Sequence, residues 1–474
     1  MRTRDVCATT MAWLVLAAPG LAAEDPHIAR IEHDLRPLVQ VQGRIEPSTS
    51  LAEAMAAHHV PAVSIAVIDH GRIVWARAYG YADVAGKVRA TPATVFQAGS
   101  ISKPVAASAA LQLVQEGLLD LDADANTELK SWRIPASPLT AEKPVTLRGL
   151  LTHTAGLTVH GFPGYAAGAP VPTVVQVLEG KPPANTAPVV VDHTPGTAWS
   201  YSGGGITIAQ LIMTDTTGQD FPDLMDKRVF APLAMGASTY EQPLPADRHD
   251  GAAGYLSSGA PVVGRAHTYP EMAAAGLWTT PTDLAKWVIA LQHAYDGGSQ
   301  ALLNQATARA MVTPGLGGWG LGIQVDGQGD SLRFSHGGDD WGFKAQLVGW
   351  LTGGRGVVVM ANGDSGMAVI QPLVQAVARA YGWKGLEPKL IAAASLTDAQ
   401  MRAFAGRYGH GLFSVEMADG KLWGRQGAGE RLEVVPTSAD HLMVLAMNLG
   451  FDVVRKDGAV TALKAGDLVI ARDP

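Results

Sequence analysis

The segment around Ser100 carries the residue types that nucleophilic catalysis requires. Residues 96–104 read Phe-Gln-Ala-Gly-Ser-Ile-Ser-Lys-Pro, so Lys103 follows Ser100 by three positions. Gly99 permits a sharp turn and Pro104 suits the first turn of a helix, so serine and lysine would share one face near a helix N-terminus. A lysine whose pKa is lowered by burial can take the proton of a serine hydroxyl. The alternative is a solvated lysine one turn from a helix-capping serine.

Two further segments could complete such a site. Tyr201 lies in a glycine-rich turn at residues 195–205, and a phenol can relay a proton when a neighbouring cation favours the phenolate. Residues 334–339 end a predicted strand with Gly337 and Gly338, which would let a substrate backbone approach the strand edge. The alternatives are an ordinary packed tyrosine and a surface hairpin turn.

Predicted strands occur at both ends of the region that holds these motifs. Residues 60–80 predict a hairpin, and residues 345–350 and 357–361 predict two later strands around a Gly-Gly turn. Helices are expected after Ser100 and over residues 367–381. We therefore expect an α+β fold: an antiparallel sheet flanked by helices, with a helical subdomain, in which the early and late strands pair.

The chain divides into four predicted parts. A positive start followed by a short apolar run indicates a secretory signal peptide, too short to span a bilayer. Asp-Gly dipeptides at 419–420 and 457–458 favour hairpin turns in a small antiparallel β-barrel. The predicted parts are the signal peptide, hydrolase domain, linker and barrel, at residues 1–22, 23–385, 386–399 and 400–474.

Composition excludes several kinds of function. The 474 residues carry a formal net charge of -7, which does not suggest a nucleic-acid partner. Cys7, the single cysteine, lies within the predicted signal, so a mature chain would have no disulfide and no thiolate metal site. No later segment predicts a membrane span, and we expect no metal or other cofactor. The signal predicts an exported protein, periplasmic or secreted.

Together the motifs resemble those of the serine β-lactamase and penicillin-binding-protein-like superfamily. The pair Ser100–Lys103 is similar to the first motif of the class C β-lactamase-like branch, Tyr201 to the tyrosine of the second, and residues 336–338 to the third. This branch includes D,D-carboxypeptidases, D-aminopeptidases and esterases. Further segments resemble landmarks of the branch, in the expected order, at residues 151–157, 231–235 and 274–284.

The resemblance implies a role for each motif residue. Ser100 would be the nucleophile, and Lys103 and Tyr201 would share the proton transfers. The backbone N–H groups of Ser100 and Asp339 would form the oxyanion hole beside Gly337 and Gly338. The imidazole of His336 would lie near the leaving group or a substrate carboxylate. Trp278 and Trp341 could line the pocket or belong to the core, and His153 is expected to order a loop.

Two departures from the family pattern affect the expected substrate. The second motif reads Tyr-Ser-Gly and lacks its asparagine, and His336 replaces the lysine of many relatives. Both favour an esterase or D-amino-acid peptidase, acting on a small ester, amide or D-amino-acid peptide, over a β-lactamase or D,D-carboxypeptidase. The C-terminal domain, which resembles a lipocalin-like appendage, favours the same group. A non-catalytic envelope binding protein on this fold is the competing hypothesis.

Overall fold

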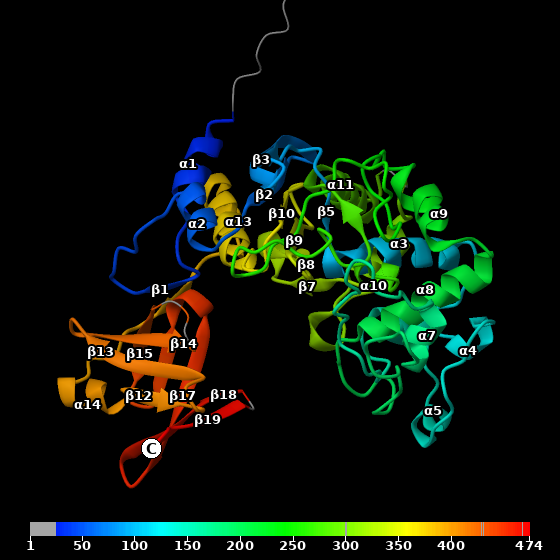
Figure 1. Cartoon of the computed structure of the whole chain (residues 1–474). Coiled ribbons are helices and arrows are strands. Elements are labelled where there is room, and N and C mark those ends of the chain that lie inside the picture. The colour runs from blue at the N-terminus through cyan, green and yellow to red at the C-terminus, as the bar shows by residue number, and fades with distance from the viewer. Residues whose placement is uncertain (1–24, 299–300, 428, 430, 467) are drawn as a thin grey trace, which may run out of the picture.

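The computed structural model describes residues 25–298, 301–427, 429, 431–466 and 468–474. The predicted signal peptide therefore lies outside the described residues. Figure 1 shows a large unit of helices around a sheet and, below it, a barrel formed by the last part of the chain. This arrangement confirms the predicted fold class. Within the described ranges, no helix is both long and apolar enough to cross a bilayer.

A seven-stranded sheet forms the centre of the large unit, in the order β4-β3-β2-β10-β9-β8-β7. The early and late strands pair as predicted, since β2 and β10 are antiparallel with Val67 opposite Val357. The strands are β2 (Ala62–Asp69), β3 (Arg72–Asp83), β4 (Val88–Arg89), β7 (Gln324–Asp326), β8 (Arg333–Asp340), β9 (Phe343–Trp350) and β10 (Gly356–Ala361).

Both faces of this sheet are covered, so its central strands are almost continuously apolar. Val63 and Val67 belong to a core shared with the terminal helices, whereas Ala66 and Ile68 face the larger core shared with the helical region. The terminal helices are α1 (His27–His33), α2 (Leu51–Ala57) and α13 (Met367–Tyr381).

The helical region lies between the two halves of the sheet in sequence. Its longest helices are α3 (Ser102–Gln115), α8 (Gly203–Thr217) and α11 (Pro281–Asp296). Helix α3 runs through the core with most of its side chains buried. The shorter helices are α4 (Ala125–Glu128), α5 (Pro138–Glu142), α6 (Leu147–Leu151), α7 (Val174–Glu179), α9 (Phe221–Met225), α10 (Met272–Ala275) and α12 (Gln305–Met311).

The C-terminal unit is an eight-stranded antiparallel sheet that closes on itself. Its last strand returns to the first, where the N–H of Gly409 donates to Ala471 O at 2.7 Å. Asp419 and Asp457 have positive φ and are followed by glycine, as hairpin turns require. The strands are β12 (Gly406–Tyr408), β13 (Phe413–Ala418), β14 (Lys421–Gln426), β15 (Leu432–Ser438), β16 (His441–Val444), β17 (Leu449–Lys456), β18 (Ala459–Ala465) and β19 (Leu468–Ala471).

The barrel is docked onto the N-terminal segment of the chain. Strand β1 (Val39–Val41) pairs in parallel with β11 (Lys389–Ile391), which lies inside the predicted linker, and α14 (Asp398–Ala403) follows. An apolar cluster that includes Met443 joins β1 and β11 to the barrel. Beside it, Arg44 donates to Glu433 at 2.7 Å. Side chains fill the interior of the barrel itself.

Candidate active site

The turn that carries Ser100 is fixed to a neighbouring segment on both sides. Strand β5 (Phe96–Gln97) pairs with β6 (Trp278–Thr279), and residues 99–101 then form a single turn of 3-10 helix before α3. Ser102 Oγ donates to Gly99 O at 2.6 Å and accepts from the N–H of Leu277 at 3.0 Å. These contacts hold the serine against residues 274–279, a segment that the sequence singled out only as a landmark.

Lys103 reaches back from α3 to Ser100, as its spacing predicts. The side chain is 2 % exposed, and its Nζ lies 2.8 Å from Ser100 Oγ and 2.8 Å from the carbonyl oxygen of Ala274. The carbonyl accepts one N–H and orients the amine toward the hydroxyl. The contact places the amine within proton-transfer distance of the Ser100 hydroxyl. The contact with Ala274 could not be predicted, because any residue supplies a carbonyl.

Tyr201 joins the pair from the end of a glycine-rich turn. Ser202 caps α8 by accepting the N–H of Gly205 at 2.9 Å, and this places Tyr201 just outside the helix. Lys103 Nζ lies 5.0 Å from the centre of the tyrosine ring. The rings of His153 and His160 pack on the same phenol, with centroids 4.3 Å and 4.7 Å away.

His153 orders the tyrosine turn, as we expected of it. Its Nδ1 accepts the N–H of Ser202 at 3.2 Å, and the imidazole is buried. Burial is the largest cause of the lowered pKa of His153, and the positive charge of Lys103 adds to it. The ring is therefore a neutral, packed support for Tyr201.

His336 lies on β8 across the cavity from Tyr201. The side chain is 5 % exposed, and its Nδ1 lies 2.6 Å from the carbonyl oxygen of Gly337. Burial, followed by the charge of Lys103, lowers the pKa of His336 to about 3, so the ring is neutral. A carbonyl only accepts, so Nδ1 carries the proton and Nε2 keeps a lone pair. Nε2 has no hydrogen-bond partner among the described residues.

Strand β8 touches the serine turn through two glycines. An added Cβ on Gly338 would lie 2.0 Å from Ala98 O, and one on Gly99, whose φ is +52°, would lie 2.4 Å from Asp339 N. Only glycine permits so close an approach. The contact brings Ser100 and Asp339, whose N–H groups are the expected oxyanion hole, onto touching segments. Strand β7 pairs only with residues 333–335, which leaves residues 336–340 unpaired on that side within the described chain.

These residues line one cavity of 630 Å³. It contains every predicted motif residue, Ser100, Lys103, Tyr201 and His336 to Asp339. Asp340 also lines it, 3 % exposed, with no hydrogen bond to either carboxylate oxygen among the described residues. Burial raises the pKa of Asp340 well above its ordinary value, against the opposing charge of Lys103. The remaining lining residues are His160, Gly161, Phe162, Pro163, Ala274, Ala275, Trp319, Gln324 and Met367.

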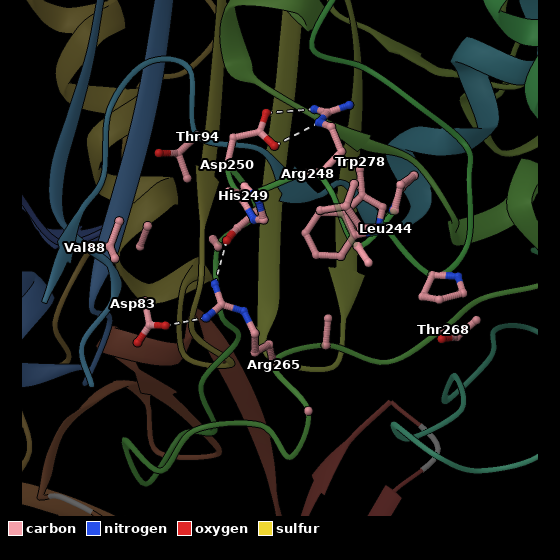
Figure 2. A pocket seen from close by; sticks show the side chains of 18 of the residues that line it. Asp83, Val88, Thr94, Leu244, Arg248, His249, Asp250, Arg265, Thr268 and Trp278 are labelled. Carbon is pink, nitrogen blue, oxygen red and sulfur yellow. Dashed lines mark hydrogen bonds and ion pairs between the residues drawn. The ribbon is translucent and has the colours of Figure 1, made fainter. Parts of the chain in front are cut away.

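Neither Trp278 nor Trp341 contributes to this lining, which corrects their expected pocket role. Figure 2 shows Trp278 among the side chains that line a separate cavity, together with Leu244 and Arg248. The volume of this cavity is 490 Å³. The side chain is 4 % exposed and its indole packs on Phe343. Trp341 is 48 % exposed in the turn after β8, stacked on His267.

Sequence reasoning missed the loop of residues 160–163 and gave Trp319 no preference over other aromatic residues. This loop follows the landmark at 151–157, and the composition of the middle of the chain predicted only loops around a site. Trp319 packs edge-on against Tyr201 and His336, with centroids 5.6 Å and 5.5 Å away. The only available signal for this tryptophan was its aromatic character.

Comparison with known proteins agrees with this geometry. The chain is 26 % identical to the protein flp of Staphylococcus aureus over 48 % of its own length and 45 % of that protein. It is 27 % identical to the putative penicillin-binding protein PbpX of Bacillus subtilis, over 55 % of this chain and 61 % of that one. The chain thus spans about half the length of the curated relatives it matches.

A solved structure shares the fold over most of the chain. The octameric penicillin-binding protein homologue from Pyrococcus abyssi superposes with a TM-score of 0.60 at 22 % identity, covering 89 % of this chain and 98 % of that one. Residues 49–381, well over half of the sequence, match the family described as Beta-lactamase. With its motif residues gathered in one cavity, the chain belongs to the Beta-lactamase family.

Proposed function

We propose that this protein is a serine hydrolase that forms an acyl-enzyme on Ser100. The observation that carries the proposal is the 2.8 Å contact between Lys103 Nζ and Ser100 Oγ, made by a buried lysine held by a backbone carbonyl. A solvated lysine beside a capping serine would not be 2 % exposed. The surrounding cavity leaves room for a small ester, amide or peptide.

The proposed reaction has two steps. The proton of Ser100 passes to Lys103, with Tyr201 as relay, while Oγ bonds to the substrate carbonyl carbon. The negative oxygen would be stabilised by the N–H groups of Ser100 and Asp339. The leaving group takes the proton and departs as the ester forms. Water then attacks the acyl-enzyme through the same groups and releases Ser100.

Within this class we favour an esterase or D-amino-acid peptidase. The third motif offers a neutral imidazole, because the pKa of His336 is lowered to about 3. The expected asparagine position holds Gly203, whose added Cβ would lie 3.0 Å from the ring of Phe162. No side-chain amide can therefore orient a substrate from this position. A β-lactamase or D,D-carboxypeptidase is the alternative hydrolase.

A non-catalytic binding protein is the second candidate, favoured by the name of the Bacillus relative. It would bind or acylate at Ser100 without turnover. We also propose that the protein is exported to the periplasm or secreted, which detection of a processed N-terminus in an envelope or culture fraction would test. Unprocessed protein recovered with the cytoplasm would contradict it.

Burst kinetics test the hydrolase proposal. With p-nitrophenyl acetate we expect a burst of p-nitrophenol near one equivalent per chain, followed by steady turnover, and neither in Ser100→Ala. A burst with no later turnover would favour the binding protein. An unchanged rate in Ser100→Ala would refute the proposal.

A further inference from the structure

The free edge of β8 carries an excess of negative charge. Asp339 lines the cavity with its side chain 78 % exposed. Lys344, opposite it on β9, is 10 % exposed and lies 2.7 Å from Asp339 and 3.1 Å from Asp364. Two carboxylates against one ammonium leave a net charge of -1 on this cluster, which we call the Asp339 cluster.

The lysine of this cluster is not available to a substrate. Lys344 also donates toward the backbone oxygen of Asp340 at 3.4 Å, so its three N–H groups have acceptors. Asp364 is held in turn by the N–H of Gly342 at 2.7 Å. Moving the buried ammonium toward a ligand would leave the partly buried carboxylate of Asp364 without its ion-pair partner, at a cost that disfavours the exchange.

Apart from Lys103, the lining adds little positive charge. Lys103 is the only lysine or arginine among the described residues that line the cavity, and it faces Ser100 and Ala274. Burial lowers the pKa of His336 to about 3, so its imidazole is neutral, and burial raises the pKa of the Asp340 carboxyl well above its ordinary value.

We infer that the Asp339 cluster makes the cavity select acyl donors that lack a free carboxylate within one residue of the scissile bond. Esters, amides and amine-bearing donors fit the site, and peptides that end in a free carboxylate beside the cleaved bond do not. This rests on the proposed hydrolase and names the substrate class it takes. Asp339 is thus a specificity residue through its side chain, apart from any role of its N–H.

A matched pair of substrates isolates the effect. N-acetyl-D-alanyl-D-alanine and its C-terminal amide differ only in the charge next to the scissile bond. At pH 8 and low salt we expect kcat/KM to be at least about tenfold higher for the amide, because the net negative charge of the Asp339 cluster repels the carboxylate of the acid. The ratio should fall as salt is raised. Equal values, or a preference for the acid, would overturn the inference.

Variants assign the preference to the cluster. Asp339→Asn should reduce the amide-to-acid ratio by at least about threefold, since it brings the net charge near zero. The control Asp398→Asn removes an exposed carboxylate from α14, outside the cavity, and should keep the wild-type ratio. A ratio that changes equally in both variants would point to overall charge and overturn the assignment.

A binding measurement separates this inference from the proposed function. Calorimetry on Ser100→Ala should show tighter binding of the amide than of the acid, whether or not the wild type turns either over. A missing p-nitrophenyl acetate burst would refute the hydrolase alone. Equal or tighter binding of the acid, or binding of neither compound, would refute the charge selection alone.

Discussion

The contact between Gly338 and the serine turn yields the sharpest prediction. In Gly338→Ala, the new Cβ would lie 2.0 Å from Ala98 O and 3.2 Å from Ala345 Cβ. A carbon–oxygen contact needs about 3.3 Å, so strand and turn must separate by about 1.3 Å. Ala98 is held in place by its N–H, which donates to Leu277 O at 2.8 Å, and Ala345 lies in the paired strand β9, so neither can rotate away as a flexible side chain could.

This separation acts on catalysis and on stability. A displacement near 1 Å between the serine and the oxyanion donors reduces kcat/KM by about a hundredfold. Overpacking also lowers the free energy of unfolding by about 1–3 kcal/mol. Urea unfolding gives the second quantity, and the rate of the p-nitrophenyl acetate burst gives the first. Near-ultraviolet circular dichroism checks that the variant keeps its tertiary packing.

The neighbouring glycine provides a matched control. In Gly337→Ala the nearest atom to the new Cβ, Gln346 Oε1, is 3.8 Å away, and φ is not positive. We expect its free energy of unfolding to stay within about 0.5 kcal/mol of the wild type. The steric reasoning is refuted if Gly338→Ala keeps both the wild-type burst rate and stability, or if the two alanine variants lose stability equally.

Three further variants test other parts of the structure. Lys103→Met should slow the burst by about 10²–10⁴-fold because it removes the base but keeps the buried volume; a burst at the wild-type rate would exclude Lys103 as the base. Glu271 has no hydrogen bond to its carboxylate oxygens among the described residues, and burial raises its pKa to about 8. Because it folds protonated and is ionised when unfolded, wild-type stability should fall between pH 5 and 8 by up to about 1.4 kcal/mol per pH unit, relative to Glu271→Gln. Parallel urea curves for both proteins across this range would contradict that assignment. Met443→Asp places a charge in the apolar cluster under the barrel and should weaken the docking of the barrel by about 2–5 kcal/mol, which would split one calorimetric unfolding transition into two. The burst amplitude should stay unchanged, because no described barrel residue lines the cavity. A single transition at the wild-type temperature would show that the cluster does not hold the barrel.

Local patterns predicted much of the framework. The hairpin at 60–80, the late strands and the helix at 367–381 occur close to their expected bounds, because β-branched runs and glycine turns specify them locally. The pairing of β2 with β10 was also predicted, since two apolar strand pairs need a shared sheet to bury both faces. The convergence of the motif residues on one cavity was predicted from their order along the chain, which matches the order of the family motifs.

Contacts made by the backbone or set by distant packing could not be predicted. Lys103 is oriented by the carbonyl of Ala274, and sequence does not specify which carbonyl a lysine meets. The direction of the Trp278 side chain depends on which face of the β5–β6 pair packs against Phe343. The docking of the barrel uses β1, over three hundred residues away in the chain, and a three-residue parallel strand leaves no distinctive pattern.

The strand order has a consequence for how activity arises during synthesis. Ser100 and Lys103 are made early, but β8 joins the first hairpin of the sheet through β9 and β10, which are made near the end of the large unit. Pairing of strands so far apart in sequence is slow, because the chain loses loop entropy before the stabilising contacts form. A nascent chain that stops short of β10 would therefore carry the proposed nucleophile, Ser100, without the assembled strand that supplies the proposed oxyanion hole. Hydrolysis would therefore require the complete sheet. Translation products that end before β10 would be inactive rather than partly active.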